Sequence, residues 1–199
     1  MAIATGLKSE ILFPGVSTIS IYNSEDAAQL TSLVAHKDLV VIGGGLLGVE
    51  ACSNLFKLKR ANKCKSACII MPENEPLGHI YGDDIGKIIR AEFDRMGIPI
   101  HSGSPAVSAE KNVVHLENGT TVEFDILVNA AGTYSTTDYL PDTVKLGKRN
   151  KIVVDEFCCT NATNIYAVGD CIDYHRHEPH WAFAQETGKQ AARHIMGVD

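Results

Sequence analysis

The sequence lacks the features that mark exported, membrane-spanning or nucleic-acid-binding proteins. No apolar run approaches the roughly 20 residues that a membrane-spanning helix needs. Residues 1–8 show no charged stretch before an apolar core, so we expect no secretory signal. The net charge of −6, without any basic run, argues against nucleic-acid binding. We therefore expect no membrane span and no nucleic-acid partner.

Cysteine is present but is not arranged in redox or metal-binding pairs. None of the six cysteines forms a C-x-x-C pattern. Without an export signal they are expected to be reduced thiols, many of them buried, in a protein of the cytoplasm or an organelle matrix. Residues of metal-binding type gather in the last quarter of the chain, but their spacings match no zinc pattern, so we expect no metal site. These residues are Cys158, Cys159, Cys171, His175, His177 and His180.

One stretch, residues 38–50, organises the rest of the chain. Leu39–Ile42 is an apolar, β-branched run typical of a strand buried on both faces. The run leads into a G-x-G-x-x-G pattern made by Gly43, Gly45 and Gly48, and residues 49–59 read as a helix. Strand, glycine turn and helix are the context that a dinucleotide site requires. The alternative is a glycine-rich turn without a ligand.

Each glycine of the pattern has its own expected task. Gly43 allows the tight turn, Gly45 lets the backbone approach a pyrophosphate, and Gly48 lets the helix pack close to the strand. The phosphates would then lie at the helix N-terminus, against free N–H groups and the positive end of the helix dipole.

The residue that contacts the adenosine ribose is less clear from the sequence. An acid is expected at the end of the next strand, about 20 residues beyond the glycines. That strand is predicted at 67–71, and Met71 occupies its end, with Glu73 two residues later. Either Glu73 serves or no side chain does, so the choice between NADH and NADPH stays open.

The remaining pattern predicts an open α/β sheet with an antiparallel hairpin. A helix over 24–36 would be capped by Ser24, and a helix over 82–97 by Asp83 or Asp84. The second helix carries an apolar stripe, which predicts core packing. The stripe consists of Ile85, Ile88, Ile89, Phe93 and Met96. Further predictions are strands at 17–22, 98–101, 124–129 and 164–170, a hairpin over 113–124 around Asn118-Gly119, and a helix over 181–196.

Three separated signals together resemble the pyridine nucleotide-disulphide oxidoreductase superfamily. They are residues 43–50, residues 4–6 followed by Pro14-Gly15, and residues 154–170, and the resemblance covers essentially the whole chain. It implies a Rossmann-like NAD(P)-binding open sheet flanked by parts of a second, FAD-binding α/β domain. The implied domains are 1–34 (a remnant of the FAD-binding domain and a connector), 35–145 (NAD(P)H binding) and 146–199 (the C-terminal part of the FAD-binding domain).

The resemblance also implies roles for single residues. Glu50 matches an acid near the nicotinamide carboxamide, and its alternative is an exposed glutamate at a helix start. Gly132 matches the strand-end glycine beside bound NAD(P)H. The FAD side is matched by Thr5, Gly6, Gly169, Asp170, Trp181 and Ala182. Within that set, Asp170 would accept a hydrogen bond from the FAD ribitol, cap a helix, or do both. Trp181 and Ala182 would open a helix aimed at the flavin.

The implied activity is that of an FAD-dependent NAD(P)H oxidoreductase, in which hydride passes from nicotinamide to flavin without an acid–base side chain. With no C-x-x-C or C-x4-C pair, the closest types are rubredoxin and ferredoxin reductases and the flavin portion of nitrite reductases. The acceptor would be a small redox protein or a small molecule. Unlike the family pattern, the chain lacks a first glycine motif and a C-terminal interface domain, and Ser135-Thr136 replaces Pro-Asn. The alternative is a truncated or split NAD(P)H-binding fragment, completed by a partner chain.

Overall fold

The computed structural model describes residues 1–174 and 179–198. The chain forms two compact units, and one is inserted into the other in sequence. We call Ser9–Gly132 the inserted unit, and Met1–Lys8 with Thr133–Asp199 the split unit. Residues 9–34, which we predicted as an FAD-domain remnant and connector, thus belong to the same compact unit as the glycine motif. Assigning each segment to a cofactor remains a prediction.

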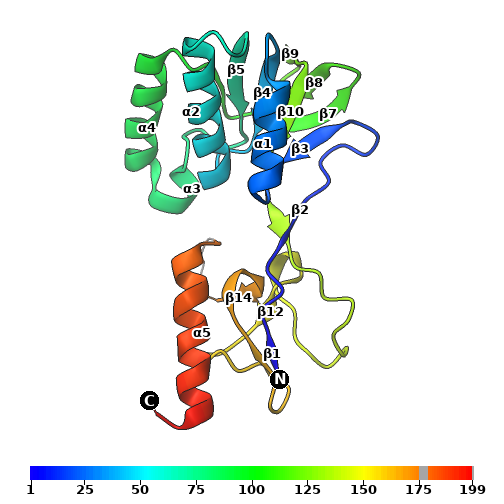
Figure 1. Ribbon diagram of the computed structural model, residues 1–199, viewed down its shortest axis with the longest axis vertical. Helices are drawn as coiled ribbons and strands as arrows, with labels where there is room; N and C mark the ends of the chain where they lie inside the picture. The colour runs from blue at the N-terminus through cyan, green and yellow to red at the C-terminus, as the bar shows by residue number, and fades with distance from the viewer. Residues whose placement is uncertain (175–178, 199) are drawn as a thin grey trace. The chain divides into compact units, whose positions relative to one another are not determined.

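The inserted unit is built on a five-stranded parallel sheet with the order β3-β10-β4-β5-β6 (Figure 1). The glycine-motif strand β4 lies at its centre. The strands are β3 (Thr18–Ser20), β4 (Asp38–Ile42), β5 (Ser66–Ile70), β6 (Ile100–His101) and β10 (Ile126–Asn129). The helices are α1 (Ser24–Leu33), α2 (Leu46–Arg60), α3 (Gly78–Tyr81) and α4 (Asp83–Met96).

Both faces of this sheet are covered, as the apolar central strands require. On one face, β4, β5 and β10 pack with α1, α2 and α4 around a core that includes Leu55, Phe56 and Phe93. On the other face they pack against an antiparallel sheet that supplies Val114 and Leu116. This sheet has the order β7-β8-β9, formed by β7 (Ala106–Glu110), β8 (Val113–Leu116) and β9 (Thr121–Glu123). The predicted α/β class with a hairpin is confirmed, and β7 is an additional strand.

Two predicted helix caps are wrong. α1 is capped by Asn23 and not by Ser24, because Asn23 forms a capping box with Asp26: the Asn23 side chain accepts from the Asp26 N–H and the Asp26 carboxylate accepts from the Asn23 N–H. α4 begins after Gly82, and neither Asp83 nor Asp84 caps it, because both already lie inside the first helical turn.

The apolar stripe of α4 is only partly in the core, contrary to the prediction. Phe93 is buried and Ile89 and Met96 pack beside it, whereas Ile85 is 44% and Ile88 64% exposed. The reason is the packing at the start of α4. A Cβ on Gly86 would lie 2.5 Å from the Cβ of Glu75, so this end of the helix rests on the loop after β5 and not on the sheet.

The split unit holds shorter elements around a small core of Ile3, Val144, Ile152, Ala167, Cys171 and Ile172. β1 pairs in parallel with β13, and β12 with β14. β2 pairs with β11 where the chain passes from one unit to the other. The elements are β1 (Ala2–Ile3), β2 (Lys8–Ser9), β11 (Thr133–Tyr134), β12 (Ile152–Val153), β13 (Tyr166–Ala167), β14 (Ile172–Asp173), the 3-10 helices η1 (Lys148–Asn150) and η2 (Gly169–Cys171), and α5 (Trp181–Met196). The strand predicted at 164–170 is thus only two residues long, whereas α5 has its predicted bounds.

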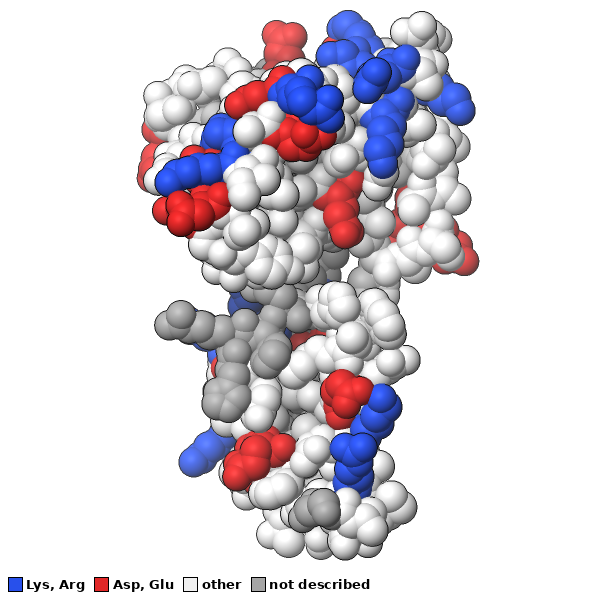
Figure 2. Space-filling model, turned by 90° about the vertical axis from the view of Figure 1, so that its left-hand side faces the viewer, with Lys and Arg blue, Asp and Glu red and all other residues white. Residues whose placement is uncertain are grey.

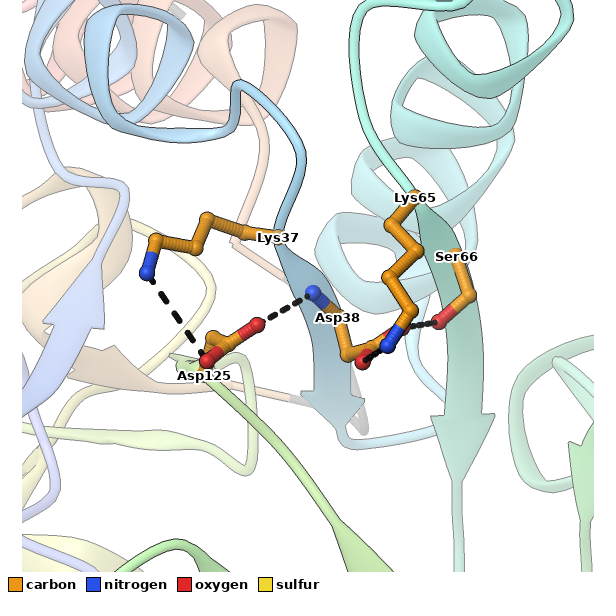
Figure 3. A network of polar contacts seen from close by, with 5 residues as sticks. All are labelled: Lys37, Asp38, Lys65, Ser66 and Asp125. Carbon is orange, nitrogen blue, oxygen red and sulfur yellow. Dashed lines mark hydrogen bonds and ion pairs between the residues drawn. The ribbon is translucent and has the colours of Figure 1, made fainter.

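A polar network joins the amino ends of β4, β5 and β10 (Figure 3). The Asp38 carboxylate accepts from Lys65 Nζ and from Ser66 Oγ, each at 2.5 Å. Asp125 accepts from the Asp38 N–H at 2.9 Å and pairs with Lys37 at 3.8 Å. Hydrogen bonds from Lys65 and then Ser66 hold the pKa of Asp38 below its usual value. The network therefore stabilises the amino ends of these strands, opposite the end that carries the glycine turn.

Charged side chains of both signs are intermixed on the surface that Figure 2 shows. No helix among residues 1–174 and 179–198 combines the length and apolar character needed to cross a membrane. All six cysteines are free, and four of them are buried: Cys52, Cys64, Cys158 and Cys171.

Candidate dinucleotide-binding site

Two glycines of the motif are needed for the turn itself. Gly43 has a φ of +123°, and a Cβ there would lie 2.2 Å from the Ala130 carbonyl oxygen at the end of β10. A Cβ on Gly48 would lie 1.9 Å from the Gly43 carbonyl oxygen. Both contacts are with backbone, so no side-chain rotation can relieve them. The two glycines let the turn fit between β10 and the first turn of α2.

Gly45 has no such structural reason to be glycine. Its φ of −78° is open to any residue, and a Cβ there would meet nothing closer than His79 Cε1 at 4.0 Å. Gly45 is also the N-cap of α2 and provides no side-chain cap for the helix. The first N–H groups of a helix have no partner within the helix. The space over Gly45 and these N–H groups therefore fit an approaching pyrophosphate.

Glu73 faces the same turn from the loop after β5. Its Oε1 lies 3.4 Å from His79 Nδ1. Its Oε2 is buried and, among residues 1–174 and 179–198, has no hydrogen-bond partner. A Cβ on Gly44 would lie 2.9 Å from this oxygen. A buried carboxylate oxygen without a donor is costly, so Glu73 is a candidate for contact with a donor group of a ligand.

Sequence reasoning missed Gly44 and His79. Gly44 is the variable position of the motif, yet a side chain there would collide with Glu73 and with Met71 Sδ, 2.7 Å from its Cβ. The available signal was the unbroken run of three glycines at 43–45. His79 had no sequence signal, because its place beside Glu73 depends on how α3 folds back toward the turn. A hydrogen bond from the Leu77 N–H to the Gly44 carbonyl at 2.9 Å holds the start of α3 against the turn.

Two other predicted contacts of NAD(P)H lie elsewhere in the inserted unit. Glu50 is exposed in the second turn of α2, where it borders a groove between α2 and α4. Gly132 has a φ of +122° after β10, and its carbonyl accepts from the Glu10 N–H at 3.1 Å. Gly132 thus needs to be glycine for its backbone, and its contact with a nucleotide, like that of Glu50, stays a prediction.

The split unit brings together the residues predicted for FAD. Ile3 pairs with Ala167 in the parallel β1–β13 ladder. Thr5 and Gly6 follow β1 while Gly169 and Asp170 follow β13, so all four lie at the carboxyl edge of this pair. Such an edge is where α/β folds bind ligands.

One of the two roles predicted for Asp170 was that of a helix cap. Asp170 does not cap α5. The N-cap is His180, whose Nδ1 accepts from the Ala182 N–H at 3.2 Å. Asp170 accepts from the His180 N–H at 3.1 Å and so ties η2 to the start of α5. Trp181, the first residue of α5, is 70% exposed.

The metal-capable residues do not gather into a site in the part of the chain that the structure describes. No group of three or more His, Cys, Asp or Glu residues suited to a metal ion occurs there. His175 and His177 lie outside the described residues. Ser135, which replaces the family's proline, is fully buried, and its hydroxyl donates to the Cys171 carbonyl at 3.2 Å.

Comparison with known proteins decides the family. The family model for pyridine nucleotide-disulphide oxidoreductases matches residues 1–191. The chain belongs to the pyridine nucleotide-disulphide oxidoreductase family. The resemblance carried by the three motifs is therefore confirmed. Members of this family use FAD and NAD(P)H and act as oxidoreductases.

Proteins similar to this chain include two curated relatives and one solved structure. The epsilon subunit of NADH-dependent phenylglyoxylate dehydrogenase from Aromatoleum evansii is 32% identical over 84% of this chain and 40% of its own length. Rubredoxin-NAD(+) reductase from Ectopseudomonas oleovorans is 29% identical over 74% of this chain and 38% of its own. The crystal structure of reduced CoADR-RHD from Bacillus anthracis superposes with a TM-score of 0.81 at 21% identity, over 99% of this chain and 38% of that one. This chain thus spans 40% or less of each, and the last likeness supports the fold alone.

Proposed function

We propose that the inserted unit binds NADH and prefers it to NADPH. The observation that carries this proposal is the buried Glu73 Oε2, which has no donor among the described residues and lies beside the glycine turn. A ribose hydroxyl of NADH would donate to the Glu73 carboxylate. A 2′-phosphate at the same place would bring a second negative charge against the carboxylate. The pyrophosphate would lie over Gly45, at the N-terminus of α2.

The split unit would supply one part of an FAD site. Thr5, Gly6, Gly169 and Asp170 share one strand edge, and α5 starts beside them through the Asp170–His180 hydrogen bond. The N-terminal turn of α5, with the exposed Trp181 and with Ala182, would place the positive end of a helix dipole toward the flavin. When bound, NADH and FAD supply hydride transfer from nicotinamide to flavin. The protein's residues bind and orient the two cofactors, and Glu50 would contact the nicotinamide end.

Taken together, these sites support an FAD-dependent NADH oxidoreductase that passes electrons to an acceptor. A small redox protein is the favoured acceptor class, because the relative from Ectopseudomonas oleovorans is named for rubredoxin, and a small molecule is the other. The alternative is an NADH-binding chain without independent catalysis, in which a partner chain completes the FAD site. The chain spans 40% and 38% of the length of the two curated relatives. Six free thiols support a reducing compartment, the cytoplasm or an organelle matrix.

Two measurements on the purified chain test the proposal. Calorimetric titration with NADH and with NADPH should show binding of NADH and a weaker or absent signal for NADPH. Substituting Glu73→Gln should narrow that difference, because the neutral amide no longer repels a phosphate. Equal affinity for both nucleotides in the unaltered chain would refute the assignment of Glu73.

Anaerobic absorption spectra then separate catalysis from binding. If the chain is a working reductase, added FAD gives a flavin band that bleaches with NADH. If NADH binds but no flavin is retained, the alternative of a binding chain completed by a partner holds.

A further inference from the structure

The loop that carries Glu73 is fastened to α4 by one side chain, Arg90. Its Nε donates to Glu75 Oε2 at 2.7 Å. Its Nη2 donates to Ser102 Oγ at 2.9 Å and also to the Asn74 carbonyl. A single guanidinium therefore connects α4, two consecutive residues of the loop and the segment that follows β6.

The surroundings of this contact make it more than a surface ion pair. The side chains of Arg90 and Glu75 are only 27% and 17% exposed. Hydrogen bonds to a charged group are stronger where water is partly excluded. The planar guanidinium directs several N–H donors in fixed directions, which a lysine ammonium on its flexible stem does not. The close approach of Gly86 to Glu75 leaves little room for the loop to shift along α4.

Backbone hydrogen bonds hold the start and the end of this loop. The Glu73 carbonyl accepts from the Gly103 N–H at 3.0 Å, and the Gly44 carbonyl accepts from the Leu77 N–H at 2.9 Å. Between these points, Arg90 holds two of the three residues, Asn74 and Glu75. With the backbone fixed on both sides, the Glu73 carboxylate keeps one oxygen beside His79 and the other beside Gly44.

We propose that Arg90 is a positioning residue for nucleotide selection: it holds the Glu73 carboxylate where that group accepts a ribose 2′-hydroxyl and excludes a 2′-phosphate. The inference rests on the proposed NADH site. Discrimination between a hydroxyl and a phosphate at one carbon requires an acid that cannot move aside, because a carboxylate on a loose loop would yield to the larger group. Arg90 provides that restraint without touching the nucleotide.

The test measures dissociation constants for NADH and NADPH by calorimetry in three variants of the full chain. Arg90→Met should weaken NADH binding about tenfold, a loss on the scale of one charged hydrogen bond. NADPH binding should change by less than about twofold, because the loosened carboxylate repels its phosphate less. Arg90→Lys, which keeps the charge but not the fork, should fall between. The matched control is Arg95→Met on the same helix. Among the described residues Arg95 pairs only with Glu92, in an exposed contact, so its loss should leave both constants unchanged.

A double substitution separates positioning from general destabilisation. In a Glu73→Gln background, Arg90→Met should alter the NADH-to-NADPH ratio by less than about twofold, since there is no carboxylate left to position. The inference is overturned if Arg90→Met leaves the ratio unchanged, whether both affinities stay the same or both fall equally. It is also overturned if the effect on the ratio persists without the Glu73 carboxylate. If the unaltered chain binds neither nucleotide, the proposed function itself fails, an outcome distinct from NADH binding that is insensitive to Arg90.

Discussion

The glycine motif offers a comparison in which structure and ligand binding respond oppositely. We predict that Gly45→Ala leaves the fold nearly intact but impairs NADH binding, whereas Gly48→Ala destabilises the fold. The two substitutions add the same methyl group, three residues apart, at the start of one helix. They differ chiefly in what the methyl group meets.

The sizes of the two effects follow from the distances. At Gly45 the nearest atom to a new Cβ is 4.0 Å away, and the φ of −78° suits alanine. The cost is then limited to a poorer N-cap, under about 1 kcal/mol in the free energy of unfolding. At Gly48 the new Cβ would lie 1.9 Å from the Gly43 carbonyl oxygen, so α2 must move away from the turn. Overpacking of this kind costs about 1–3 kcal/mol or more.

Urea unfolding and calorimetry measure the two outcomes on the same samples. Gly45→Ala should keep the unfolding midpoint close to that of the unaltered chain and raise the NADH dissociation constant about 10- to 100-fold, because the methyl group fills the space for the pyrophosphate. Unaltered NADH affinity in Gly45→Ala would refute the assignment of that space to a phosphate. A Gly48→Ala protein as stable as the unaltered chain would refute the packing argument.

Two further predictions concern protonation. Asp38→Asn should lower the free energy of unfolding by about 1 kcal/mol near neutral pH. Since the folded-state pKa of Asp38 is lowered, this difference in stability should persist above about pH 4 and vanish as pH falls through that lowered value. Urea titrations across acid pH in which the stabilities of the two proteins do not converge would contradict the role of the network. Burial raises the pKa of Cys52 to about 12 and that of Cys68 to about 11. Iodoacetamide at pH 8 should therefore spare both thiols in the folded protein and modify both in urea, as measured by mass spectrometry. Rapid labelling of either thiol in the folded state would show that the core opens.

The sequence was most informative where all the signals are local. The strand, glycine turn and helix over 38–60 were predictable because pattern, turn and period lie within one short stretch. The caps were harder. Ser24 and Asn23 are both good capping residues, and the choice depends on Asp26, three residues after Asn23, which completes the capping box.

The features that sequence reasoning did not predict depend on contacts between segments that are distant in the sequence. Glu73 could be proposed as the ribose acid, but its unpartnered oxygen and its contact with Gly44 exist only once β4 and β5 lie side by side. The same holds for Arg90, whose partners belong to a loop and to the segment after β6. Ile85 and Ile88 followed the helical period correctly, yet α4 turns them to the surface because its first turns rest on a loop.

The insertion of one unit into the other also sets an order of assembly. Every strand of the parallel sheet and its covering elements lies within Ser9–Gly132, so this unit can complete its contacts as soon as that segment has left the ribosome. β1 emerges before the inserted unit, yet its partner β13 begins only at Tyr166. β1 therefore remains without β13 while the inserted unit forms. The pairing of β1 with β13 is a late, long-range event, and its loop-closure entropy is reduced because the intervening chain has already become compact.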